Sequence, residues 1–297
     1  MGIASLKEQL AGKVGRVRER LPVLEHVFTM LAHYRKVNGN GQAAAATYFG
    51  FLSFFPILAL AFFVIGYISK VWPDAQDQLV DALDQVLPGV VGNGEGEIAM
   101  STFEDNASAI GVIGLVGVVY SGLGWLSGMR SALEVMFSQP TSHQPKFFVG
   151  KARDLLGLTV LGLVLMLSIA LTAALSGFSE VILGWMRLDG SRLAAVVLWV
   201  VAHGLAIAAT TVLFVAMFKL LARPRLSFSA LVHGALLGGV GFELLKSLAN
   251  FLIGTTQNQP AFQAFGVALV LVLWINYFSR LVMSGAAWAY TSRDADR

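Results

Sequence analysis

The chain has 297 residues, of which 56% are hydrophobic and only 13% are charged, and its formal net charge is +3. Soluble domains carry about 25% charged residues, so this composition excludes an ordinary soluble protein and predicts an integral membrane protein. Cysteine is absent, which excludes disulfides, cysteine-ligated zinc, iron–sulfur clusters and thiol nucleophiles.

Residues 1–41 form a basic segment in which leucine, valine and aromatic side chains recur at helical spacing. The segment has seven lysine or arginine residues against three glutamates. This pattern predicts one or two amphipathic helices that lie on an anionic membrane leaflet, with membrane lipids as partners. A nucleic-acid-binding arm is the competing interpretation. Basic segments beside a membrane are common, however, so no nucleic acid is expected as a partner.

Six apolar stretches follow, and most reach the roughly 20 residues needed to cross the hydrocarbon of a bilayer. They predict an all-α fold, a six-helix transmembrane bundle within residues 42–291, followed by a short tail at 292–297. The predicted spans lie near residues 44–68, 107–127, 155–178, 195–218, 228–250 and 264–289. Because residues 1–41 lack the apolar core and cleavage site of a signal peptide, the first span is expected to direct insertion.

The loops between the predicted spans alternate in charge. Residues 70–105 carry eight acidic residues and one lysine, which predicts an extracytoplasmic insertion containing an amphipathic helix. Its acidic face is interpreted as solvated, and a cation-attracting vestibule is the less favoured alternative. The loops after the second and fourth spans are basic instead. Since positive loops stay on the cytoplasmic side, both termini are predicted in the cytoplasm of a bacterial inner (plasma) membrane.

Pro56 lies inside the first predicted span, where its ring removes a backbone hydrogen bond and predicts a kink. Ordinary helix packing is favoured there over a transport-linked break. The second span is rich in glycine, which lets helices approach closely and predicts a central, buried helix. Arg130 follows at its cytoplasmic end, with Glu134 one turn later. An interfacial ion pair and a contact to a substrate headgroup are the two interpretations of this pair.

The fifth span carries Glu243 and Lys246 within an otherwise apolar helix. Together with Gly239 and Asn250, they fall on one helical face. A charge at the centre of a membrane helix costs roughly 2.5–3.5 kcal/mol, so this face is predicted to look into the bundle or a wet cavity. We interpret these polar residues as a candidate translocation site. A buried pair that fixes helix register, with no substrate, is the alternative.

The sixth span adds Asn276 and Arg280 to the candidate translocation residues. Arg280 lies nearer the cytoplasm than Glu243. The sequence therefore predicts a polar seam, meaning polar side chains of the two spans at two depths in the membrane, instead of a single Glu243–Arg280 salt bridge. Basic residues at the cytoplasmic mouth are candidate headgroup contacts: Lys219, Arg223 and Arg225. His203 and His233 are each isolated, which favours hydrogen bonds to neighbouring helices over a metal site.

Catalytic motifs are missing from the sequence. It contains no phosphate-binding glycine loop ending in Gly-Lys-Ser/Thr, no H-E-x-x-H zinc motif and no G-x-S-x-G nucleophile elbow. A carboxylate pair can in principle do acid–base work, but no soluble domain is expected to enclose a substrate. We therefore expect no enzyme activity, no cofactor and no metal.

Four stretches, taken in their order and spacing, carry a likeness to a known family. They are AAAATYFGFLSFFPILAL at 43–60, IGVIGLVGVVYSGLGWLSGMRSALE at 110–134, GFELLK at 241–246 and AFGVALVLVLWINYFSRLVMSGAAW at 264–288. Through them the chain resembles the YihY/BrkB family of bacterial inner-membrane proteins, and within it the YhjD-type branch. The wider family often has Trp-x-Tyr and Gly-Ala-Glu in its last span. This chain has Trp274-Ile275-Asn276 and Gly285-Ala286-Ala287 there, so a role of that tyrosine or glutamate is not carried over.

The resemblance implies a part in envelope integrity and in moving a lipid or lipid-linked precursor across the inner membrane. The expected function is therefore a transporter or flippase-like protein for a lipid or another anionic amphipathic envelope component. The alternative is a structural or assembly protein for envelope integrity with no substrate, and a homo-oligomer is compatible with both. The family also bears an old ribonuclease label. Ribonuclease is the least favoured function, because the residues present no RNA-cleaving centre.

Overall fold

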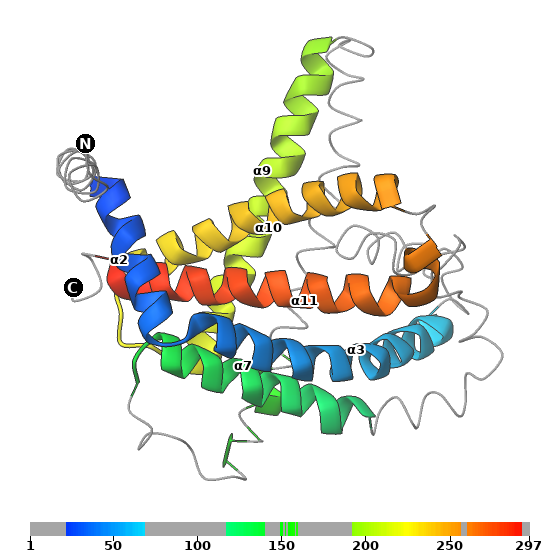
Figure 1. Cartoon of the computed structure of the whole chain (residues 1–297), viewed down its shortest axis with the longest axis horizontal. Helices are drawn as coiled ribbons and strands as arrows, with labels where there is room; N and C mark the ends of the chain where they lie inside the picture. Colours follow the sequence, from blue (N-terminus) through cyan, green and yellow to red (C-terminus); the bar gives the residue numbers. More distant parts are fainter. Residues whose placement is uncertain are drawn as a thin grey trace, which may run out of the picture.

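The computed structural model describes residues 22–68, 117–139, 192–256 and 260–292, together with parts of the segment 149–159 (Figure 1). The regular structure within these residues is entirely helical. The helices are α2 (Pro22–Lys36), α3 (Gly39–Ile68), η1 (Val118–Gly122), α7 (Leu123–Met136), α9 (Arg192–Met217), η3 (Phe218–Ala222), α10 (Phe228–Thr256) and α11 (Pro260–Thr291).

Four stretches of the described helices are long and apolar enough to cross a membrane. They are Gly39–Leu58, Trp199–Ala222, Phe228–Leu248 and Ala268–Thr291. These stretches coincide with the first, fourth, fifth and sixth predicted spans. Residues 1–21, the predicted insertion at 70–105 and most of the predicted third span at 155–178 lie outside the described residues. The count of six spans therefore stays a prediction.

The second predicted span corresponds to η1 and α7, and the helix continues beyond the predicted end at residue 127. Helix α7 ends at Met136, so Arg130 and Glu134 lie inside it. Their charges were expected to mark the start of a loop. Instead, the Arg130 side chain is buried and engaged by carboxylates, and arginine is a good helix former, so α7 continues past it.

The long helices are arranged around α11. Helices α3, α7 and α11 run side by side, and α10 packs along α11 (Figure 1). Helix α9 packs against α10 but crosses it steeply, so that its N-terminal half stands away from the other described helices (Figure 1). Helix α2 crosses the end of the bundle at which α3 begins and α11 ends (Figure 1). This end is the predicted cytoplasmic side.

The buried core lies where α7, α9, η3, α10 and α11 meet near that end. Its largest fully buried side chains include Met129, Leu133, Phe214, Phe218 and Met283. The aromatic rings pack edge to face, as between Phe137 and Phe218, whose ring centroids are 5.6 Å apart. Close packing of this kind supplies the attraction between helices in lipid, where apolar burial alone gives little.

Glycine lets the backbones of α10 and α11 touch. A Cβ atom on Gly234 would lie 2.3 Å from the backbone oxygen of Gly285, and a Cβ on Gly285 would lie 2.6 Å from the backbone oxygen of Gly234. No side chain fits at either position without moving a helix. The crossing of these two helices is therefore fixed by a pair of glycines, as is usual for closely packed membrane helices.

Helix α3 continues through Pro56 as one helical element and packs there against the start of η1. A Cβ on Gly117 would meet Pro56 Cβ at 3.0 Å, so the glycine admits the proline ring. The hydroxyl of Ser53 lies 2.7 Å from the backbone oxygens of both Phe49 and Ser121. The predicted close approach of the glycine-rich second span is thus confirmed at the contact with α3.

Candidate functional site

Among the described residues, two separate groups of charged side chains lie within the helix bundle. The first, which we call the Glu243 cluster, consists of His203, Glu243 and Lys246. Lys246 Nζ lies 2.6 Å from Glu243 Oε2, one turn apart on α10, as the spacing in the sequence suggested. His203 Nε2, on α9, lies 3.9 Å from Glu243 Oε1. The cluster therefore joins two apolar helices through one carboxylate.

The Glu243 cluster is only partly buried, and its contacts are not saturated. The side chains of Glu243, Lys246 and His203 are 16%, 20% and 35% exposed. Glu243 Oε2 is buried but accepts no well-directed hydrogen bond, even though Lys246 Nζ is close to it. Their contact is an ion pair without the angles of a hydrogen bond.

The ring of His203 is oriented by its own helix. Its Nδ1 atom lies 2.9 Å from the backbone oxygen of Trp199, and the imidazole packs on the indole at 4.2 Å between ring centroids. A carbonyl oxygen can only accept, so Nδ1 carries the hydrogen. In the neutral ring, Nε2 then directs a lone pair towards Glu243, whereas a proton on Nε2 turns the contact into an ion pair. His203 thus has a hydrogen bond within α9 and a contact at 3.9 Å with Glu243 of the neighbouring helix α10.

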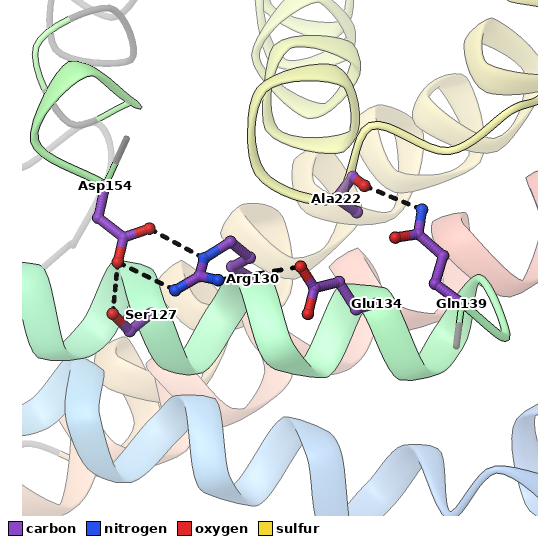
Figure 2. A network of polar contacts seen from close by, with 6 residues as sticks. All are labelled: Ser127, Arg130, Glu134, Gln139, Asp154 and Ala222. Carbon is purple, nitrogen blue, oxygen red and sulfur yellow. Dashed lines mark hydrogen bonds and ion pairs between the residues drawn. The ribbon is translucent and has the colours of Figure 1, made fainter. Parts of the chain in front are cut away.

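The second group, the Arg130 cluster, consists of Ser127, Arg130, Glu134 and Asp154 (Figure 2). Arg130 donates from Nε to Asp154 Oδ1 at 2.9 Å and from Nη2 to Asp154 Oδ2 at 3.2 Å. Ser127 donates to the same Oδ2 atom at 2.5 Å. Arg130 Nη1 lies 3.9 Å from Glu134 Oε1. The guanidinium is thus held between two carboxylates.

The Arg130 cluster has the properties of a structural ion pair. The side chains of Arg130 and Asp154 are 11% and 2% exposed, and their fork-to-fork geometry satisfies both partners. Close by, Gln139 donates to the backbone oxygen of Ala222 at 2.9 Å and ties the end of α7 to η3 (Figure 2). A guanidinium already engaged in this way is poorly placed to bind a headgroup.

Asp154, the main partner of Arg130, is a residue that sequence reasoning missed. It stands one residue before the predicted third span and beside Arg153, so the loop was counted as purely basic. The signal that points to it is the charge of Arg130 itself. An arginine in a buried helix needs a carboxylate partner, and Asp154 is the nearest acidic residue along the chain after Glu134.

The sixth-span candidates lie apart from both clusters. Asn276 donates to Thr47 Oγ1 at 3.2 Å and so links α11 to α3. Arg280 is exposed, with its guanidinium carbon 5.7 Å from the ring centroid of Tyr277. It also acts on Tyr34 of α2: burial raises the pKa of Tyr34, and the charge of Arg280 partly offsets that rise. Asn250 lies in α10, and its side chain is outside the described part of the chain.

The three candidate headgroup residues are exposed around the end of η3. Lys219 Nζ lies 4.7 Å from the ring centroid of Phe228. Arg223 ends η3 with a left-handed backbone, at φ 51° and ψ 52°, and Arg225 follows in the connection to α10. His233 lies one turn into α10, with Nδ1 3.4 Å from Ser229 Oγ of its own helix. Among the described residues, no group of histidine or acidic side chains is arranged to hold a metal ion.

The apolar spanning helices, with charged side chains between them, define the class of the protein: it is a membrane-embedded helical protein. Residues 30–297 match the family described as "Virulence factor BrkB", and the chain belongs to that family. The family resemblance predicted from the sequence is confirmed.

Three known proteins are similar to the chain over most of its length. The chain is 26% identical to inner membrane protein YhjD of Escherichia coli (strain K12) over 282 residues, which cover 94% of this chain and 84% of that protein. It is 27% identical to an uncharacterized protein of Dickeya dadantii (strain 3937), over 95% of this chain and 87% of that protein. It is 20% identical to the ribonuclease-like protein YfkH of Bacillus subtilis (strain 168), over 86% and 90%. No solved structure matches the chain significantly.

Proposed function

We propose that this inner-membrane protein is a transporter or flippase-like protein for a lipid or another anionic amphipathic component of the envelope. The observation that carries the proposal is the Glu243 cluster. It holds three ionisable side chains on two apolar helices, and they are partly exposed and incompletely paired. Charges at such positions are costly and usually mark a path for a substrate or an ion.

The depth of the cluster fits this role. Glu243 is 15 residues past Phe228, where the apolar part of α10 begins, and His203 is 4 residues past Trp199, where that of α9 begins. At about 1.5 Å per residue, these positions lie roughly 22 Å and 6 Å along their helices. The helices run in opposite directions across the membrane, so both residues fall towards the same face, which is the predicted extracytoplasmic one.

In the proposed mechanism, the exposed cations at the end of η3 attract an anionic headgroup at the cytoplasmic mouth. These cations are Lys219, Arg223 and Arg225. At the opposite face, Glu243 exchanges its contact with Lys246 for a proton, which leaves the Lys246 ammonium to contact the anionic substrate. Arg130 takes no part in binding and braces α7 through Asp154. Arg280 and Asn276 were expected on the same polar seam, and we leave them outside the transport path because they lie apart from the Glu243 cluster.

The second candidate function is a structural or assembly protein without a substrate. The Arg130 cluster favours this alternative, because it is a buried network of paired charges of the kind that fixes how helices pack. If the Glu243 cluster had the same role, its loss would reduce the amount of folded protein.

A deletion strain tests the proposed function. We expect its membrane lipids or lipid-linked precursors to change in amount or in leaflet distribution, and wild-type protein to restore them. Glu243→Gln should fail to restore them while reaching the wild-type level in the membrane. The matched control is Thr210→Ala on α9, whose hydroxyl bonds only within its own helix. A Glu243→Gln protein that is degraded supports the structural alternative, and full restoration by it refutes a role for Glu243.

We also propose that the protein is not a ribonuclease, although one relative is named ribonuclease-like. Detergent-purified protein should leave RNA intact. Cleavage that persists through further purification and disappears in a point variant would contradict this proposal.

A further inference from the structure

Helix α2 presents three different faces. Its 15 residues place side chains at about 100° intervals, so positions three and four apart share a side. One face packs on the bundle through His26, Met30 and His33. A second face is apolar and exposed. The third carries small or polar side chains and is also exposed, and it contains Thr29, Ala32 and Lys36.

The bundle face of α2 is held by two histidines that bind helix ends. His26 Nε2 lies 3.1 Å from the backbone oxygen of Trp288 in the last turn of α11. His33 Nε2 lies 2.7 Å from the backbone oxygen of Met136 at the end of α7, and its ring stacks on Tyr290 at 4.5 Å between centroids. The last carbonyl groups of a helix lack partners within it, so these contacts supply what both helix ends need.

The exposed apolar face of α2 consists of Leu24, Phe28 and Leu31, which are 36%, 43% and 40% exposed. They follow the spacing i, i+4, i+7 and form one continuous stripe. Exposed basic side chains, Arg35 and Lys36, stand at the end of the helix. A stripe of this composition next to basic residues matches the boundary between anionic headgroups and acyl chains.

The position of α2 places that stripe at a membrane boundary. Helix α2 crosses the end of the bundle where the apolar stretch of α3 begins and that of α11 ends (Figure 1). A sharp corner separates α2 from α3: Asn38 has a left-handed backbone with φ 53°, and its side-chain oxygen accepts from the backbone NH of Gly41 at 3.3 Å. The chain thus turns from a helix across the bundle end directly into a membrane span.

We propose that α2 is an interfacial lipid-binding helix, which inserts Leu24, Phe28 and Leu31 into an anionic leaflet while its histidines grip the ends of α7 and α11. The basic residues that precede it in the sequence add to the attraction: Lys7, Lys13, Arg16, Arg18 and Arg20. Lipid bound there would stabilise the contact of α2 with both helices. This surface is distinct from the Glu243 cluster, and the proposal stands independently of transport.

The absence of cysteine from the chain makes a direct test practical. Single cysteines at Leu24, Leu31, Thr29 and Ala32 each carry one spin label in the full-length protein, reconstituted in nanodiscs that contain phosphatidylglycerol. Power saturation then compares collisions with oxygen, which is enriched in lipid, and with a water-soluble nickel chelate. Labels at Leu24 and Leu31 should favour oxygen several-fold more than labels at Thr29 and Ala32.

Two results would overturn the proposal. If all four labels collide with the nickel chelate at the same rate, the stripe faces water. If the labels at Leu24 and Leu31 are immobilised and shielded from both reagents, a protein partner or a second copy covers the stripe. A second experiment tests the role of charge. In the Arg35→Gln/Lys36→Gln protein, the label at Leu31 should lie less deep in the bilayer of anionic nanodiscs, and its depth in zwitterionic nanodiscs should stay unchanged. Equal depth before and after the substitutions in anionic nanodiscs would refute the electrostatic part.

Discussion

Replacing Asp154 with alanine should destabilise the protein strongly, because it leaves the buried charge of Arg130 without its main partner. Breaking a buried ion pair by removing one side costs about 3–5 kcal/mol. Glu134 lies 3.9 Å from Arg130 and retains part of the attraction, so we expect a loss near the lower end of that range, about 3 kcal/mol. The side chain of Asp154 is only 2% exposed, so water cannot replace it easily.

The assay is unfolding in mixed detergent micelles, followed by the loss of helical circular dichroism. Ser127→Ala is the matched control, because it removes one hydrogen bond to the same carboxylate and should cost about 1 kcal/mol. The double variant Arg130→Met/Asp154→Leu removes both charges and should recover most of the loss. If Asp154→Ala is no less stable than Ser127→Ala, or if the double variant is as unstable as Asp154→Ala, the ion pair does not brace α7.

Three further predictions follow from the packing and from one titrating group. Gly234→Val should prevent stable folding, because its Cβ would lie 2.3 Å from the α11 backbone. The control Gly204→Ala adds a Cβ in open space and should keep the wild-type yield of folded protein in size-exclusion chromatography. Ser53→Ala should cost about 1 kcal/mol in the same unfolding assay, since one hydroxyl joins α3 to η1, and a neutral effect would show that this contact is dispensable. Burial raises the pKa of Tyr34, so the stabilisation that the neutral Tyr34 contributes is present below pH 10 and is lost as the pH rises through the pKa of the folded state. Tyr34→Phe should therefore reduce the fall in stability at high pH. If the fall is as steep in Tyr34→Phe as in the wild type, other groups cause it.

The sequence allowed the membrane spans to be predicted because their signal is local. An apolar stretch of sufficient length identifies a span without knowledge of its neighbours, and four such stretches coincide with described helices. The pairing of Glu243 with Lys246 was predictable for the same reason, since residues three apart on a helix are adjacent. Membership of the family was also predictable from the sequence, because the family is recognised by the order of its motifs along the chain.

The contacts between helices were not predictable in this way. Asp154 reaches Arg130 across 24 positions, and His203 reaches Glu243 only because α9 crosses α10 where it does. The side of α11 that faces outward is set by its packing on α3 and α10, so the sequence left open whether Arg280 points into the bundle or outward, and the structure shows it exposed. Spacing along one helix carries no information on how that helix is rotated against its neighbours.

The most direct test of the proposed function measures movement of a fluorescent phosphatidylglycerol between leaflets of proteoliposomes, with dithionite quenching of the outer leaflet as the readout. Wild-type protein and Thr210→Ala should move the lipid faster than protein-free vesicles do. Glu243→Gln should fall to the protein-free rate while keeping its helicity and its elution volume. The account is contradicted if folded Glu243→Gln protein moves the lipid as fast as wild type, or if wild-type protein, with or without a proton gradient, moves it no faster than empty vesicles.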